Sequence, residues 1–114
     1  MFAKAERLKK SADFKHLARR GRSVTGQLLQ IRFLPNGLDT CRFAFVTGLK
    51  ISKKAAVRNK ARRRLSEAVK KLAPLINKKF DFLFFAKAQI ASKTQAEIIN
   101  DVEKIFKKAG IYTT

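Results

Sequence analysis

The chain has 114 residues and carries 27 lysines and arginines against 8 acids, which gives a formal net charge of +19 and a pI near 11. This length suits one domain, residues 1–114, and a hydrophobic content of 46% with ten phenylalanines excludes a basic disordered tail. No apolar run has the length of a membrane span, and the first ten residues lack the apolar segment of a signal peptide. We therefore expect a cytoplasmic protein with a polyanionic partner. Nucleic acid is favoured over an anionic membrane, which would require bulky apolar anchors on an amphipathic helix.

The amino-terminal part predicts an arm followed by a short helix. Residues 1–10 are polar and basic and are expected to form a flexible, extended arm. Two apolar side chains are available to tether this arm: Phe2 and Leu8. Ser11 can cap a helix over residues 11–20, and Gly21 is placed to end it.

Three stretches predict strands. Residues 23–34 alternate in polarity, and the turn sequence at 35–37 predicts that residues 42–47 are the hairpin partner of that strand. Residues 80–86 are apolar on both faces, which is typical of a strand in the middle of a sheet.

Two longer helices follow from periodicity and capping. Residues 55–72 place a narrow apolar stripe on one side, formed by Val57, Ala61, Leu65, Ala68 and Leu72. Thr94 and Glu97 form a capping box for a last amphipathic helix that ends at Gly110. The sum is an α+β fold, a two-layer α/β sandwich with a small, mostly antiparallel sheet and about three helices. A βαβ crossover is expected where residues 42–47 lead through the helix at 55–72 to the strand at 80–86.

The stretch 50–71 holds much of the charge. It has ten basic residues and one acid, so it contributes +9 of the formal +19. On a helix whose apolar stripe faces a core, arginines occupy nearly all of the remaining surface. A solvated basic face is the alternative, but arginine outnumbers lysine in the centre of this stretch, and guanidinium groups bind phosphate bidentately. The pattern favours an RNA or DNA backbone as partner.

Side chains for catalysis are scarce. His16 lies on a basic helix and is expected to be exposed or to contact phosphate, and Cys41 is expected to be a buried thiol. Glu97 and Asp101 stand four residues apart, but an ordinary solvated helix face is favoured over a metal site. No phosphate loop, zinc pattern or triad spacing occurs, so we expect no active site and no metal site in this chain. The phenylalanines nearest to basic residues are candidates for base stacking, although most phenylalanines are expected in the core: Phe14, Phe33, Phe43 and Phe45.

The run KISKKAAVRNKARRRLSE at residues 50–67 resembles the signature of the bacterial ribonuclease P protein component. The hallmark of that family is an Arg-Asn pair followed by basic residues three and four positions after the Asn, here Arg58, Asn59, Arg62 and Arg63. Residues 11–14 and 20–23 match the family in order and spacing, and the resemblance covers nearly the whole chain.

This resemblance implies a specific role. Family members are the protein subunit of a ribonucleoprotein in which RNA is the catalyst, and the complex removes the 5′ leader from precursor tRNA with Mg²⁺ held mainly by the RNA. The family fold contains a left-handed βαβ crossover, against the usual handedness. The residues expected to bind the catalytic RNA are Lys53, Lys54, Arg58, Asn59, Lys60, Arg62 and Arg63. The residues expected in the cleft for the single-stranded leader, between the first helix and the sheet, are Phe14 and Arg32.

The chain departs from the family pattern at three positions. Ser66 stands where an arginine is usual, and Ala18 and Arg32 stand where many members carry aromatic rings in the cleft. Neither a membrane nor a second protein is an expected partner. Two other classes stay open: a structural, ribosomal-type RNA-binding protein, and a protein-only nuclease, against which the absence of a carboxylate cluster speaks.

Overall fold

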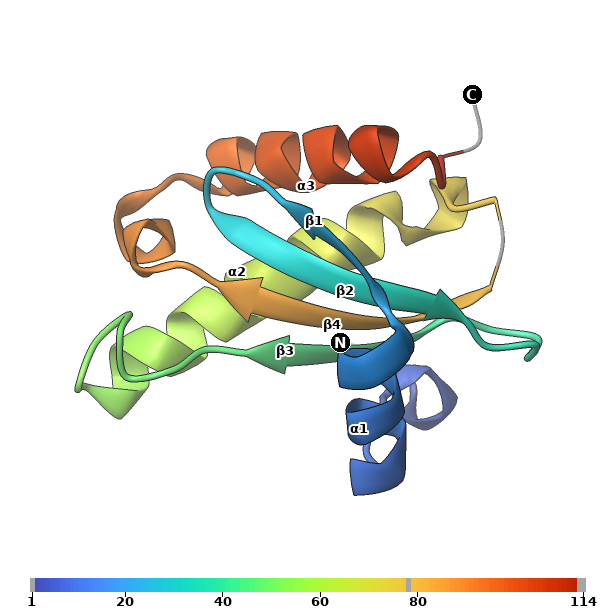
Figure 1. Ribbon diagram of the computed structural model, residues 1–114. Coiled ribbons are helices and arrows are strands. Elements are labelled where there is room, and N and C mark those ends of the chain that lie inside the picture. Colours follow the sequence, from blue (N-terminus) through green and yellow to red (C-terminus); the bar gives the residue numbers. More distant parts are fainter. Residues whose placement is uncertain (1, 78, 113–114) are drawn as a thin grey trace.

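A computed structural model describes residues 2–77 and 79–112. Within them, a four-stranded sheet lies between helices, and Figure 1 shows α3 and α1 at opposite ends of the view with the sheet between them. The helices and strands in chain order are α1 (Ser11–Arg20), β1 (Arg22–Thr25), β2 (Leu29–Pro35), β3 (Arg42–Val46), α2 (Ala55–Leu72), β4 (Phe80–Ala86) and α3 (Gln95–Ala109). Short 3₁₀ turns lie at Lys4–Glu6, Ala73–Leu75 and Ala88–Ser92.

The strand order is β1-β2-β4-β3. The β1/β2 and β2/β4 pairs are antiparallel, whereas β3 and β4 are parallel and joined through α2. The α+β class, the mostly antiparallel sheet and the βαβ crossover are therefore confirmed. The predicted hairpin between residues 23–34 and 42–47 is wrong, because β4 lies between β2 and β3. A strand that is apolar on both faces, here β4, buries most apolar surface in a central position. The chain after β2 therefore continues to β3 at the edge of the sheet and leaves the place beside β2 to β4.

The stretch 23–34, predicted as one strand, is two strands with a turn at 26–28. A contact distant in sequence stabilises this turn, since the backbone N–H groups of Gln27 and Leu28 donate to the two carboxylate oxygens of Asp101 at 3.1 and 2.9 Å. The chain also passes so close to α3 at Gly26 that an added Cβ would lie 2.5 Å from Ile105 Cδ1. The alternation of polarity within residues 23–34 cannot indicate this turn, because the turn depends on contacts with α3.

The central strand β4 supplies both faces of the sheet with apolar side chains. Phe82 and Phe84 pack in the main core with α2 and α3, and they lie between Phe43 of β3 and Phe106 of α3. On the other face, Leu83 belongs to a smaller cluster beneath α1. The central position predicted for this strand is confirmed.

The three predicted helices have the expected bounds. In α2 the stripe of Ala61, Leu65, Ala68 and Leu72 is buried, as predicted, and Val69 adds to it, while Val57 is only half-buried. The α3 capping box between Thr94 and Glu97 is present, and Gly110 ends the helix with a positive φ of 74°. The predicted Ser11 cap is wrong: Lys10 holds the N-cap position of α1, without a side-chain hydrogen bond.

The amino-terminal segment is packed on the sheet. The flexible arm predicted for residues 1–10 is replaced, over residues 2–10, by a segment that includes a 3₁₀ turn and lies along β3. Leu8 donates its backbone N–H to the Phe43 carbonyl at 2.9 Å, and both Phe2 and Leu8 are buried. These two apolar side chains supply enough contact to order an otherwise polar segment.

No helix in the described parts of the chain is both long and apolar enough to cross a membrane.

Candidate nucleic-acid interface

The outward surface of α2 is cationic and solvent-accessible. Because Ala61 and Leu65 face the core, Arg62 and Arg63 point away from it and are exposed, together with Asn59. Within residues 2–77 and 79–112, neither of these two arginines forms an ion pair; Arg62 donates to the Asn59 side chain at 3.3 Å. Their charges are therefore not neutralised inside the protein.

Arg58 has a different environment. It is half-buried, and its Nη1 donates to the backbone carbonyls of Ser52 and Lys53 at 2.9 and 3.0 Å. Arg58 thereby fixes the loop before α2, which presents Lys53 and Lys54 to solvent. The predicted RNA-binding arginine thus also organises neighbouring backbone.

A second basic surface covers α1 and its flanks. Residues 4–22 contain eight lysines and arginines, all exposed, and two acids. By contrast α3 has three cations and three acids, and Lys107 forms an ion pair with Glu103 at 3.2 Å. The excess charge is therefore concentrated on the α1 and α2 sides of the molecule, as expected for a surface that faces a polyanion, and not spread evenly for solubility.

An open groove of about 730 Å³ lies between these two basic surfaces. Its aromatic lining comes from Phe2, Phe14, Phe43 and Phe45, and α2 contributes Asn59, Arg62, Arg63, Ser66 and Glu67. Of the four rings, Phe14 and Phe45 are half-buried, so each offers an accessible edge or face. Half-exposed rings beside guanidinium groups are the combination that binds single-stranded nucleic acid, through base stacking and phosphate contacts.

The groove unites residues that the sequence assigned to separate sites. Phe14, predicted for the leader, lines the same groove as Asn59, Arg62 and Arg63, predicted for the catalytic RNA. The other predicted RNA-binding residues are not part of the groove lining: Lys53, Lys54, Arg58 and Lys60.

Arg32 lies at the carboxyl end of α1. Its guanidinium donates to the carbonyls of Leu17, Ala18 and Gly21 at 3.3, 2.9 and 2.9 Å. The Leu17 carbonyl also accepts the Gly21 N–H at 2.8 Å, whereas Arg32 supplies a donor to the carbonyls of Ala18 and Gly21 at the end of the helix. Arg32 was predicted to bind the leader, whereas in the structure it caps α1.

Sequence reasoning assigned no site to six residues of the groove lining: Phe2, Arg7, Leu8, Lys9, Ala44 and Glu67. Phe2 was expected only as a tether of the amino-terminal arm, and its burial against Phe43 also brings it to the groove. Ser66, which the sequence singled out as a departure from the family pattern, lines the groove beside Arg62 and Arg63. Of the four rings named as candidates for stacking, Phe33 and Phe43 are buried in the core.

Polar side chains outside the groove have structural roles. Burial raises the pKa of the Cys41 thiol, which disfavours the nucleophilic thiolate. His16 is exposed, as expected. Asp101 is buried beneath the β1–β2 turn, so the solvated face predicted for Glu97 and Asp101 holds for Glu97 alone. Among the residues that the structure describes, no three His, Cys, Asp or Glu side chains gather to hold a metal ion.

Fold and site together define a class: a small cationic α+β protein in which a basic crossover helix borders an aromatic groove. The sequence model of the ribonuclease P family matches residues 2–110. The chain belongs to the ribonuclease P protein component family. Members are the protein subunit of an endoribonuclease that processes tRNA, so membership implies a role in ribonuclease P and ribonuclease P RNA as partner.

Individual relatives agree over nearly their full lengths. The ribonuclease P protein component of Clostridium novyi is 33% identical over 114 residues, covering 96% of this chain and 97% of the relative. That of Syntrophomonas wolfei is 30% identical over 112 residues, covering 98% and 93%. The solved structure of the Staphylococcus aureus RNase P protein superposes with a TM-score of 0.84 at 28% identity, covering 96% of this chain and 99% of that one.

Proposed function

We propose that this chain binds the catalytic RNA of ribonuclease P through α2 and holds the single-stranded 5′ leader of precursor tRNA in the groove, while the RNA cleaves the leader. The observation that carries the proposal is the exposed pair Arg62 and Arg63, free of acidic partners among the described residues, at the border of an aromatic groove. Bidentate phosphate contacts would hold the folded RNA, and the half-exposed rings would stack on unpaired leader bases.

The protein's part in the reaction is binding and orientation. Lys53, Lys54 and Lys60 extend the cationic surface beyond the groove, so a folded RNA can contact the loop and the outer side of α2 together. We assign the Mg²⁺ that the reaction requires to the RNA partner, because the described carboxylates do not form a magnesium site. Asp81 pairs with Arg42, Asp101 accepts backbone N–H groups, and the Glu97 carboxylate accepts the Thr94 N–H at the start of α3.

Reconstitution tests the proposal. The purified protein is added to a bacterial ribonuclease P RNA at a magnesium concentration too low for the RNA alone, and removal of the leader from precursor tRNA is followed. We expect cleavage to be restored in proportion to the protein added. No stimulation at any protein concentration would favour a structural RNA-binding protein, and cleavage without added RNA would favour a protein nuclease.

A second experiment tests binding of the leader separately from binding of the RNA subunit. The reconstituted holoenzyme is given precursor tRNAs with a long leader and with a leader of a single nucleotide. If the groove holds the leader, KM is lower for the long-leader substrate. Equal KM values would remove the leader from the proposed function and leave RNA binding in place.

A further inference from the structure

Helix α1 has a small apolar contact with the sheet. Leu17 is its one buried side chain, and it packs with Leu8 and Leu83, while Phe14 is half-buried beside them. The helices on the other face share a much larger cluster. Apolar contact is not directional. This small set of side chains therefore fixes how close α1 lies to the sheet, but it fixes the tilt of α1 and its position along the sheet less well.

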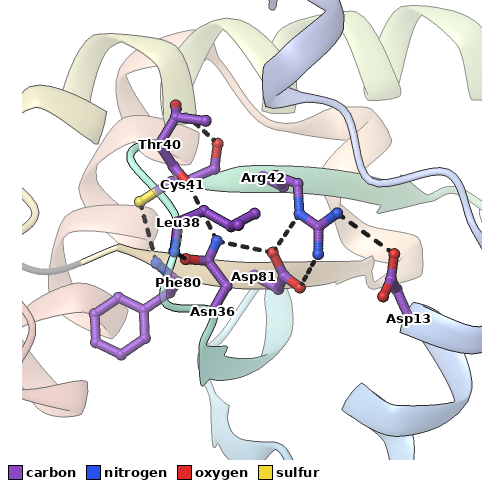
Figure 2. A network of polar contacts seen from close by, with 8 residues as sticks. All are labelled: Asp13, Asn36, Leu38, Thr40, Cys41, Arg42, Phe80 and Asp81. Atoms are coloured by element: carbon purple, nitrogen blue, oxygen red, sulfur yellow. Dashed lines mark hydrogen bonds and ion pairs between the residues drawn. The ribbon is translucent and has the colours of Figure 1, made fainter.

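At the amino-terminal end of α1, an arginine of the sheet supplies a directional contact. The Arg42 guanidinium donates to Asp81 through two nitrogens at 2.8 and 2.6 Å, and its third nitrogen lies 3.4 Å from Asp13 Oδ2 of α1. Figure 2 shows the guanidinium between these two carboxylates. The bond to Asp81 is a two-point, charge-assisted contact, whereas the contact to Asp13 is a looser ion pair.

The guanidinium is held in place before it meets α1. Arg42 and Asp81 face each other across the parallel β3/β4 pair, and Asn36 donates to Asp81 at 3.0 Å and to the Thr40 carbonyl at 3.1 Å. The hydrogen bond to Asp81 raises the pKa of Arg42 above its ordinary value. Arg42 is therefore a fixed cation, anchored to the two strands, with one edge directed to α1.

At the other end of α1, Arg32 of β2 donates to the carbonyls of Leu17, Ala18 and Gly21. The Asp13 carboxylate in the first turn and the Arg32 cation at the last carbonyls both complement the helix dipole. Each end of α1 is thus contacted by a different arginine of the sheet, Arg42 at the amino-terminal end and Arg32 at the carboxyl end.

We propose that Arg42 and Arg32 clamp α1 at its two ends and so set the width of the groove between Phe14 and α2, which makes Asp13, Arg42 and Arg32 positioning residues for the strand that the groove holds. In the ion pair between Arg42 and Asp13, each residue is the sequence neighbour of a groove-lining ring: Asp13 precedes Phe14, and Arg42 precedes Phe43. This inference rests on the proposed function of the groove.

The test uses Asp13→Asn with Glu103→Gln as its matched control. Both variants remove one carboxylate from an ion pair and raise the net charge equally, but Glu103 lies on α3 and pairs with Lys107. Electrostatics alone would make both variants bind RNA more tightly. The clamp predicts the opposite sign for Asp13→Asn: in the reconstituted holoenzyme, KM for the long-leader precursor rises about two- to fivefold, the effect of losing one weak, half-buried ion pair. KM for the single-nucleotide leader and affinity for the RNA subunit should change no more in Asp13→Asn than in the control Glu103→Gln.

Arg32→Lys provides an independent variant, because it keeps the charge and loses the three-point fork. It should raise KM in the same leader-dependent way. Amide hydrogen exchange of the free protein adds a readout that needs no RNA: both variants should speed exchange in α1 and leave α2 unchanged. Unchanged exchange in α1, or an equal rise in KM for both substrates, overturns the clamp. If the wild-type holoenzyme has the same KM for the long-leader and the single-nucleotide-leader precursors, the leader function itself is refuted. In that case amide hydrogen exchange in α1 alone tests the clamp.

Discussion

The ring of Phe2 stacks on the ring of Phe43, with centroids 4.5 Å apart and an angle of 22° between the planes. This contact joins the amino-terminal segment to the edge strand of the sheet, and both rings line the groove. The floor of the groove therefore includes a residue at the very start of the described chain. Phe2 also lies 6.0 Å from Phe45, so three rings form one continuous aromatic surface.

Truncating this anchor should destabilise the protein. Phe2 is 5% exposed, and we expect Phe2→Ala to lower the free energy of unfolding by about 3 kcal/mol, the range for a buried phenylalanine. Phe2→Leu, which keeps most of the apolar area, should cost about 1 kcal/mol. Urea unfolding measures both. Equal stability of Phe2→Ala and wild type would mean that the segment contributes nothing to the core.

The exposed arginines of α2 should account for much of the salt dependence of holoenzyme assembly. Arg62→Ala combined with Arg63→Ala removes about two phosphate contacts, so the slope of log Kd against log salt should fall by about two. Lys104→Ala combined with Lys108→Ala removes the same charge from α3, which has no excess charge, and serves as the control. Titrations of the RNA subunit at several salt concentrations give both slopes. A slope unchanged in the α2 double variant contradicts the assignment.

The helices could be predicted from the sequence because their signals are local. The bounds of α2 follow from an apolar stripe at helical spacing and from Pro74, and those of α3 from the Thr94 capping box and Gly110. The partner of each strand is not a local property. That β4 separates β2 from β3 depends on which strand gains most from central burial, and the hairpin rule cannot weigh that competition.

The candidate site could be predicted by residue type but not by arrangement. From the apolar stripe of α2, the sequence placed Arg63 on the outward side of that helix and placed Arg62 with Arg58 along one flank of the stripe. It could not show that Arg58 and Arg32 donate to backbone carbonyls of this chain, and their contacts with RNA stay predictions. Whether an arginine also binds its own backbone depends on which carbonyls the fold brings beside it, and that is not a local property of the sequence.

Asp101 stabilises the β1–β2 turn from a distance and should be costly to remove. It is 7% exposed, and Asp101→Ala would leave the N–H groups of Gln27 and Leu28 without an acceptor. We expect a loss of about 3 kcal/mol in the free energy of unfolding, because buried donors lose charge-assisted bonds. Asn100→Ala, at the adjacent exposed position, should change it by less than about 0.5 kcal/mol. A similar small loss in both variants would mean that solvent replaces the carboxylate.

Glu97 should make part of the stability of α3 depend on pH. Hydrogen bonds from the backbone N–H and the hydroxyl of Thr94 lower the pKa of this carboxyl below its ordinary value of 4.5. A carboxyl whose pKa is lower in the folded state stabilises the fold above its unfolded pKa, and this contribution is lost as the pH falls from 4.5 through the folded value. Glu97→Gln should therefore be less stable than wild type at neutral pH and should lose less stability on acidification. Urea unfolding of both proteins at neutral and acidic pH measures the difference, and parallel pH profiles would show that the capping carboxylate contributes no linkage.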